Sequence, residues 1–113
     1  WSIDEDRVLL TGMSDGGTFS MLTSIIEKGP YTHVAPISGS FHPFILEGAR
    51  DMSDTPMYLV HGALDWMFPV AMAREAYDAL RVAGADVTYR EIADLSHTYP
   101  RDENPRILDW FLQ

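Results

Sequence analysis

Most information about the fold comes from one segment, Arg7-Val8-Leu9-Leu10-Thr11-Gly12-Met13-Ser14-Asp15-Gly16-Gly17. Its first half is an apolar, β-branched run, which is typical of a buried strand. The run enters the pattern G-x-S-x-G at Gly12, and apolar residues at helical spacing follow. A strand that leads through this pattern into a helix forces the serine into a tight bend, with its hydroxyl exposed at the end of a sheet. Flanking glycines remove the Cβ atoms that would obstruct the bend and the packing of the helix on the strand.

Predicted strands and helices alternate along the rest of the chain. We predict strands at residues 7–13, 32–37, 57–61 and 87–92, and helices at about 16–27, at 71–82 and from 104 onward. Alternation of this kind indicates βαβ crossovers. The sequence therefore predicts an α/β fold, with a parallel sheet of about four strands flanked by helices, in one domain without repeats or linkers.

Composition limits the possible partners and compartment. Of 113 residues, 17 are acidic and 8 are basic, so the net charge is −9. A surface of that sign repels phosphate backbones and anionic headgroups, and no apolar run approaches the ~20 residues that span a bilayer. We therefore predict no nucleic-acid partner and no membrane association. The absence of cysteine excludes disulfides, thiolate metal sites and a cysteine nucleophile, and it suits a cytoplasmic location.

Residues suited to nucleophilic chemistry follow the predicted strands. Ligands bind at the carboxyl ends of the strands in a parallel sheet. Ser14 follows the first strand, Asp65 the third and His97 the fourth. A serine hydroxyl needs an imidazole to take its proton, and the imidazole needs a carboxylate to fix its tautomer and stabilise its cation. The order Ser…Asp…His therefore predicts a nucleophile, an acid and a base at one edge of the sheet.

Three motifs carry a resemblance to a known family. They are Gly12-Met13-Ser14-Asp15-Gly16-Gly17, His61-Gly62-Ala63-Leu64-Asp65 with Pro69, and Ser96-His97-Thr98-Tyr99-Pro100. With these motifs, which span nearly the whole chain, the sequence resembles the C-terminal half of an α/β-hydrolase of the small carboxylesterase, phospholipase and dienelactone-hydrolase type.

The resemblance implies a role for each catalytic candidate. Ser14 would be the nucleophile, Asp65 the triad acid and His97 the general base, and the backbone N–H of Asp15 would be one oxyanion donor. The second donor in this family normally comes from a loop after an earlier strand, and that loop is absent from this sequence.

The implied function is cleavage of a small-molecule carboxylic ester through an acyl-enzyme, without a cofactor. A metal site is not predicted, because no two histidines are spaced i, i+3 or i, i+4 and no H-E-x-x-H motif occurs. Two other functions stay open. One is a serine peptidase or amidase of the same fold, and the other is a catalytically silent hydrolase-like module that serves as a scaffold.

The nucleophile and the acid have alternative interpretations. Ser14 could simply cap the helix that follows it, and Asp65 could cap the next helix. Asp94 and Glu91 compete with Asp65 as the acid, although Asp94 is so close to His97 in sequence that the imidazole would reach Ser14 poorly.

Three other histidines compete with His97 for the role of base. We expect His33 to lie at the start of a strand, away from the carboxyl edge. His61 belongs to the turn that shapes the acid loop in the resembled family, so we expect a structural role for it. His42 lies on a loop at the edge and could touch substrate. His97 lies in a short polar loop from which an imidazole can swing over Ser14.

Aromatic and sulfur-containing side chains gather in the loops beside this edge, and they could form an acyl or alcohol pocket. The predicted substrate contacts are Phe41, His42, Trp66, Met67 and Tyr99, with Phe44 and Phe68 nearby. The charge of Asp15 should disfavour anionic groups close to Ser14.

The first strand is expected to have an unpaired outer edge. The chain begins at Trp1 without an initiator methionine, and in a complete hydrolase the strand at 7–13 would lie mid-sheet. Free N–H and C=O groups on such an edge are a template for association. We therefore interpret residues 1–113 as the C-terminal portion of an α/β-hydrolase domain, in which a missing N-terminal segment or another chain covers this edge.

Overall fold

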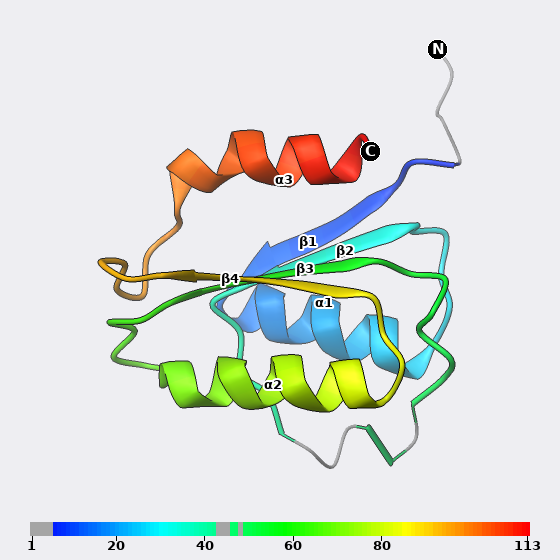
Figure 1. The fold of residues 1–113 in the computed structure, drawn as a ribbon, viewed down its shortest axis with the longest axis horizontal. Helices are drawn as coiled ribbons and strands as arrows, with labels where there is room; N and C mark the ends of the chain where they lie inside the picture. The colour runs from blue at the N-terminus through cyan, green and yellow to red at the C-terminus, as the bar shows by residue number, and fades with distance from the viewer. Residues whose placement is uncertain (1–5, 43–45, 48) are drawn as a thin grey trace.

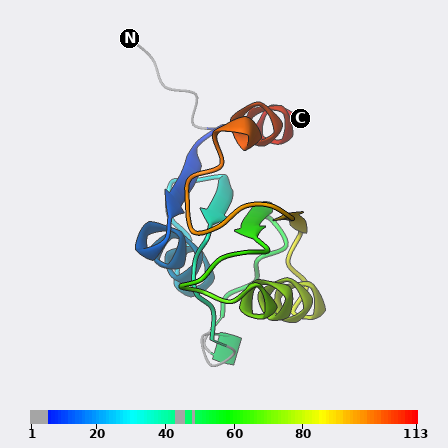
Figure 2. The ribbon, with the colours of Figure 1, turned by 90° about the vertical axis from the view of Figure 1, so that its left-hand side faces the viewer.

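The computed structural model describes residues 6–42, 46–47 and 49–113. They form a parallel sheet of four strands in the order β1-β2-β3-β4. Helices α1 and α2 cover one face of this sheet, and α3 covers the other (Figures 1 and 2). The predicted α/β fold with a four-stranded parallel sheet is confirmed.

The elements follow the predicted order. The strands are β1 (Leu9–Met13), β2 (His33–Ile37), β3 (Met57–Gly62) and β4 (Val87–Ile92), and the helices are α1 (Asp15–Ile26), α2 (Val70–Val82), the 3-10 turn η2 (Arg101–Glu103) and α3 (Asn104–Phe111). The largest difference from prediction is the start of β1, because the N–H of Val8 donates to the hydroxyl of Thr32 and not to a strand carbonyl. None of the helices in the described part of the chain is long and apolar enough to cross a membrane.

The central strands are the most buried part of the sheet. All of β3 and four of the five residues of β2 are buried, whereas β1 and β4 are mostly half-buried. Apolar strands buried on both faces are typical of parallel sheets with helices on each side. All four strands end at the same edge, where the loops after β1, β3 and β4 gather (Figure 1). The fold therefore brings three separate loops to one place.

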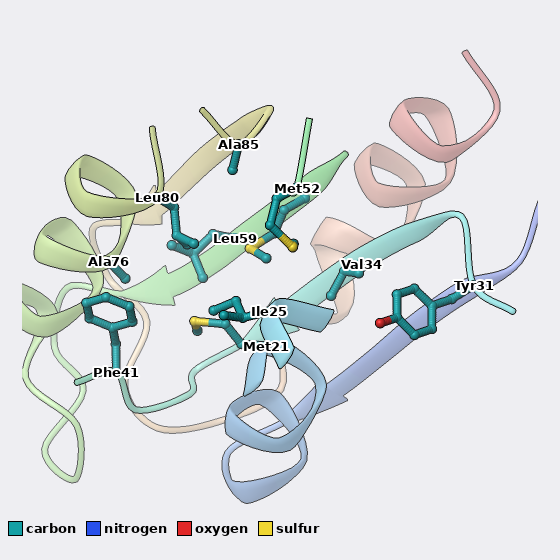
Figure 3. Close-up of a cluster of buried hydrophobic side chains, with 11 residues drawn as sticks. Met21, Ile25, Tyr31, Val34, Phe41, Met52, Leu59, Ala76, Leu80 and Ala85 are labelled. Carbon is teal, nitrogen blue, oxygen red and sulfur yellow. The ribbon is translucent and has the colours of Figure 1, made fainter. Parts of the chain in front are cut away.

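The core has two layers, one on each face of the sheet. Alternate residues of β3 face opposite sides, as the pleat requires. Leu59 packs with α1 and α2, against Met21, Ile25 and Leu80 (Figure 3). Tyr58 and Val60 pack on the other face, where Ile107 and Trp110 of α3 join the smaller cluster.

Candidate active site

Ser14 lies in a strained bend between β1 and α1. Its φ is 59° and its ψ is −119°, a conformation that costs energy for a residue with a Cβ and persists only where neighbours hold it. The Ser14 N–H donates to the carbonyl of Ile37 at 2.9 Å, and the Ser14 carbonyl accepts the N–H of Thr18 at 2.9 Å. Ser14 occupies the position before the helix, but its side chain makes no capping hydrogen bond. Its hydroxyl is therefore free to bond elsewhere.

Two of the three glycines in this motif are required by close backbone approach. A Cβ on Gly12 would lie 2.6 Å from the carbonyl group of Gly16, and a Cβ on Gly17 would lie 2.5 Å from the carbonyl oxygen of Ile37. At Gly16 the expectation from the sequence is wrong, because an added Cβ would meet nothing within 4 Å. Gly12 allows the turn and Gly17 allows α1 to pack against β2.

The structure brings Ser14, His97 and Asp65 into one hydrogen-bonded chain. The Ser14 Oγ lies 2.8 Å from the His97 Nε2, and the His97 Nδ1 lies 2.8 Å from the Asp65 Oδ2. The carboxylate of Asp65 is fully buried and the imidazole of His97 is nearly so. These residues come from the loops after β1, β3 and β4.

Local hydrogen bonds fix the charge and orientation of the Asp65 carboxylate. Its Oδ1 accepts the N–H groups of Met67 at 2.9 Å and Phe68 at 2.8 Å. Burial raises the pKa of Asp65, but the hydrogen bond from His97 and the two backbone N–H groups outweigh burial, and the net pKa is below its usual value. An ionised carboxylate only accepts hydrogen bonds, so the proton of neutral His97 lies on Nδ1, and Nε2 accepts the Ser14 hydroxyl.

His61 supports the loop that holds Asp65. Its side chain is buried, and Nε2 lies 2.7 Å from the carbonyl oxygen of Phe68 and 3.4 Å from the Asp65 Oδ2. Because a carbonyl only accepts, Nε2 carries the proton. His61 therefore holds the acid loop, as the sequence predicts, and it does not bond to Ser14.

The other acid and base candidates lie outside this chain of bonds. Glu91 binds Arg74 through two hydrogen bonds of 2.8 and 2.9 Å, and Asp94 lies exposed on the turn after β4. His33 starts β2 and packs against the rings of Trp110 and Phe111.

The predicted substrate contact Trp66 lies beside His97, and so does Phe68. The Trp66 ring lies 5.9 Å from the His97 ring, and the ring of Phe68 lies 5.5 Å from it, both edge-on. Trp66 is 72% exposed and Met67 is 45% exposed. This loop therefore presents apolar surface next to the imidazole.

The other predicted contacts are placed differently. Phe41 is 6% exposed and packs in the core cluster (Figure 3), so it is mainly a core residue, although it also lines a cavity of about 260 Å³ together with the exposed His42. The Tyr99 hydroxyl donates to the Asn104 side chain, and Tyr99 lines a groove between β1 and α3. Phe44 lies outside the described residues.

Sequence reasoning missed Thr18, which ties the Ser14 bend to the loop after β2. Its Oγ1 bonds the Ser14 carbonyl at 3.3 Å and the Ser40 hydroxyl at 3.0 Å, and it accepts the Ser40 N–H at 2.8 Å. Its place one helical turn after Ser14 is the signal that could have found it. In the ranges described, no group of three or more His, Asp and Glu residues could hold a metal ion.

Residues 1–111 match the family model of the phospholipase/carboxylesterase family. The chain belongs to this family. A non-reducing polyketide synthase of Aspergillus calidoustus is 40% identical over 45 residues, which are 40% of this chain and 2% of the synthase.

Solved structures share the fold of this phospholipase/carboxylesterase family member. Arabidopsis thaliana SOBER1 has a TM-score of 0.83 and 22% identity, over 97% of this chain and 54% of SOBER1. Esterase PE8 has a TM-score of 0.81 and 23% identity, over 97% and 51%. Zea mays acyl-protein thioesterase 2 has a TM-score of 0.72 and 18% identity, over 90% and 53%. The chain spans about half the length of these proteins. The resemblance to an α/β-hydrolase is confirmed at the level of family and fold.

Proposed function

We propose that this chain carries the catalytic residues of a serine esterase, which hydrolyses a carboxylic ester through an acyl-enzyme. The observation that carries the proposal is the pair of 2.8 Å hydrogen bonds from Ser14 to His97 and from His97 to Asp65. Membership of the phospholipase/carboxylesterase family supports a hydrolase of esterase type. No cofactor enters the reaction.

In the acylation step, the Ser14 Oγ attacks the ester carbonyl carbon while the His97 Nε2 takes the hydroxyl proton. The imidazolium that forms is stabilised by the Asp65 carboxylate, which stays ionised because its pKa is low. The tetrahedral intermediate collapses, and the bond between the carbonyl carbon and the alcohol oxygen breaks. His97 gives its proton to that oxygen, so an alcohol leaves and the acyl group stays on Ser14.

In the deacylation step, water replaces the alcohol. The water oxygen attacks the acyl carbon while His97 takes a proton from the water. The bond from that carbon to the Ser14 Oγ then breaks. The proton then returns to Ser14, and a carboxylic acid is released.

The backbone N–H of Asp15 supports the oxyanion. Asp15 is the first residue of α1, where an N–H has no acceptor inside the helix. One donor of this kind contributes about 10² to 10³ in rate. A second donor would come from a loop outside these residues, since the chain spans about half of the similar structures.

The test is labelling with a fluorophosphonate probe, alongside turnover of a panel of ester and peptide substrates. We expect Ser14→Ala to abolish labelling and to lower ester turnover roughly 10⁴- to 10⁶-fold, with an unchanged circular dichroism spectrum. The control is Ser53→Ala, an exposed serine on the turn after Met52, which should label normally. Turnover of Ser14→Ala within tenfold of the parent would refute the nucleophile, and faster cleavage of peptides than of esters would favour a peptidase.

A further inference from the structure

Trp66 is an exposed indole in contact with the imidazole of His97. It directly follows Asp65, and 72% of its surface is exposed, although its ring centre is only 5.9 Å from that of His97, at 71° between the ring planes. An exposed indole beside reactive groups offers a ligand a large apolar face and an aromatic ring to pack on.

The loop that carries Trp66 is held in place by the acid itself. The Asp65 Oδ1 accepts the N–H groups of both Met67 and Phe68, and His61 donates to the Phe68 carbonyl. Trp66 therefore sits at the tip of a turn whose two sides are fixed by buried groups. A turn whose backbone is already fixed loses little conformational entropy when a ligand packs on it.

The chemistry of the proposed reaction places the alcohol portion of the ester near this ring. His97 must give its proton to the leaving oxygen, so that oxygen must come within about 3 Å of Nε2. The group bonded to the leaving oxygen then lies next to the imidazole. Phe68, the second ring against His97, is half-buried in the same turn, so Trp66 offers more open apolar surface.

We propose that Trp66 is a specificity-determining residue that binds the alcohol portion of the substrate and favours esters of neutral aromatic alcohols. This inference rests on the proposed esterase function. An aromatic ring packs on an indole more favourably than its buried area alone accounts for. The exposed Asp15 side chain, next to Ser14, disfavours an anionic alcohol.

The acyl portion of the substrate is not assigned to Trp66. The cavity of about 260 Å³ at this edge is lined by residues of α1, α2 and the loop after β2, namely Thr18, Leu22, Ser40, Phe41, His42 and Met72. Changes at Trp66 should therefore affect discrimination between alcohols and leave discrimination between acyl groups unchanged.

The test compares benzyl butyrate with propyl butyrate, which give the same acyl-enzyme, in the complete polypeptide that carries these residues. We expect Trp66→Ala to lower kcat/KM for the benzyl ester roughly five- to tenfold, the range that one lost aromatic pair supports, and for the propyl ester less than twofold. Intrinsic ester reactivity cancels in this double ratio. Trp66→Phe should keep most of the preference. The control Leu64→Ala, an exposed apolar residue in the same loop, should leave the ratio unchanged.

A second readout uses the reverse of acylation, in which the butyryl-enzyme transfers its acyl group to an added alcohol. The measured quantity is the ratio of butyryl transfer to the added alcohol over butyryl transfer to water. In Trp66→Ala this ratio should fall by the same factor for benzyl alcohol, whereas for propanol it should not fall. A merely structural role would lower both equally, and that result would overturn this inference alone. If the parent shows no turnover that depends on Ser14, the proposed function falls and this inference with it.

Discussion

The protonation states of three side chains depend on one another: the Ser14 hydroxyl, the His97 imidazole and the Asp65 carboxylate. The Asp65 Oδ1 is occupied by two backbone N–H groups, so only Oδ2 faces His97. This arrangement makes Nδ1 the protonated nitrogen and leaves Nε2 to accept from Ser14. The tautomer that the proposed reaction needs is therefore set by the turn at 65–68, and not by His97 alone.

We expect Asp65→Asn to lower ester turnover about 10⁴-fold, as a similar change does in a known triad. If the amide oxygen keeps the bonds to Met67 and Phe68, the NH₂ group faces the His97 Nδ1. That nitrogen must then accept, so the proton moves to Nε2 and the imidazole can no longer take the Ser14 proton. Steady-state turnover with a circular dichroism check measures the effect.

The control for this prediction is Asp94→Asn, which changes the exposed acid on the turn before His97. Its turnover should stay within twofold of the parent. A large loss of turnover in Asp94→Asn, together with normal turnover in Asp65→Asn, would show that Asp94 is the triad acid.

At the residue scale, the sequence predicts candidate positions better than side-chain directions. Ser14, Asp65 and His97 follow strands of a parallel sheet, so the topology alone places their backbones at one edge. Phe41 and Tyr99 lie in loops, where no periodicity indicates which way a side chain points. Packing decides instead, and it directs Phe41 into the core and Tyr99 toward α3.

At the scale of elements, a bidentate ion pair joins α2 to β4. The Arg74 guanidinium donates to both carboxylate oxygens of Glu91, and the Tyr89 hydroxyl donates to one of them. These hydrogen bonds, first that of Arg74, lower the pKa of Glu91 to about 2. The pair is largely exposed, so it contributes about 1 kcal/mol at most.

This pair predicts a pH-dependent contribution to stability. The folded pKa of Glu91 lies below its ordinary value of 4.5, so the contribution is complete above about pH 4.5 and is lost as the pH falls toward 2. We expect Glu91→Gln to lower the urea midpoint at pH 7, and the difference from the parent to disappear near pH 2.

The matched control is Glu75→Gln, which neutralises an exposed carboxylate on α2. It should shift the midpoint less at pH 7. Equal midpoints of Glu91→Gln and the parent at pH 7 would show that the pair adds nothing to stability.

The types of the elements were predictable because the apolar pattern agrees with the positions of glycine and proline, which end helices and strands, along most of the chain. The limits of the elements depend on which groups accept each backbone N–H, and a sequence does not display this. At the start of β1, the hydroxyl of Thr32 accepts the hydrogen bond from the N–H of Val8. The turn η2 precedes α3 without a distinct sequence signal.

At the scale of the whole molecule, the two edges of the sheet differ in their surroundings. Among the described residues, β1 pairs with β2 alone, and β4 pairs with β3 alone. A groove of about 280 Å³ runs beside β1, lined by Leu9 and Thr11 of the strand and by Ile107, Leu108 and Phe111 of α3. Leu108 is 53% exposed there. A free strand edge next to apolar side chains favours pairing with another strand.

We propose that this edge is covered, either by another segment of the same protein or by another chain. The 113 residues alone should therefore self-associate in light scattering. Their ester turnover should be about 10² to 10³ below that of the complete polypeptide, because the second oxyanion donor that we propose lies outside them. Leu108→Glu should reduce the association, since it places a charge beside the edge. The control is Val82→Glu, which makes the same change in net charge at an 87% exposed residue of α2, on the other face of the sheet. This variant should not reduce the association. A monomeric chain of these residues with the full turnover of the complete polypeptide would show that the edge needs no cover.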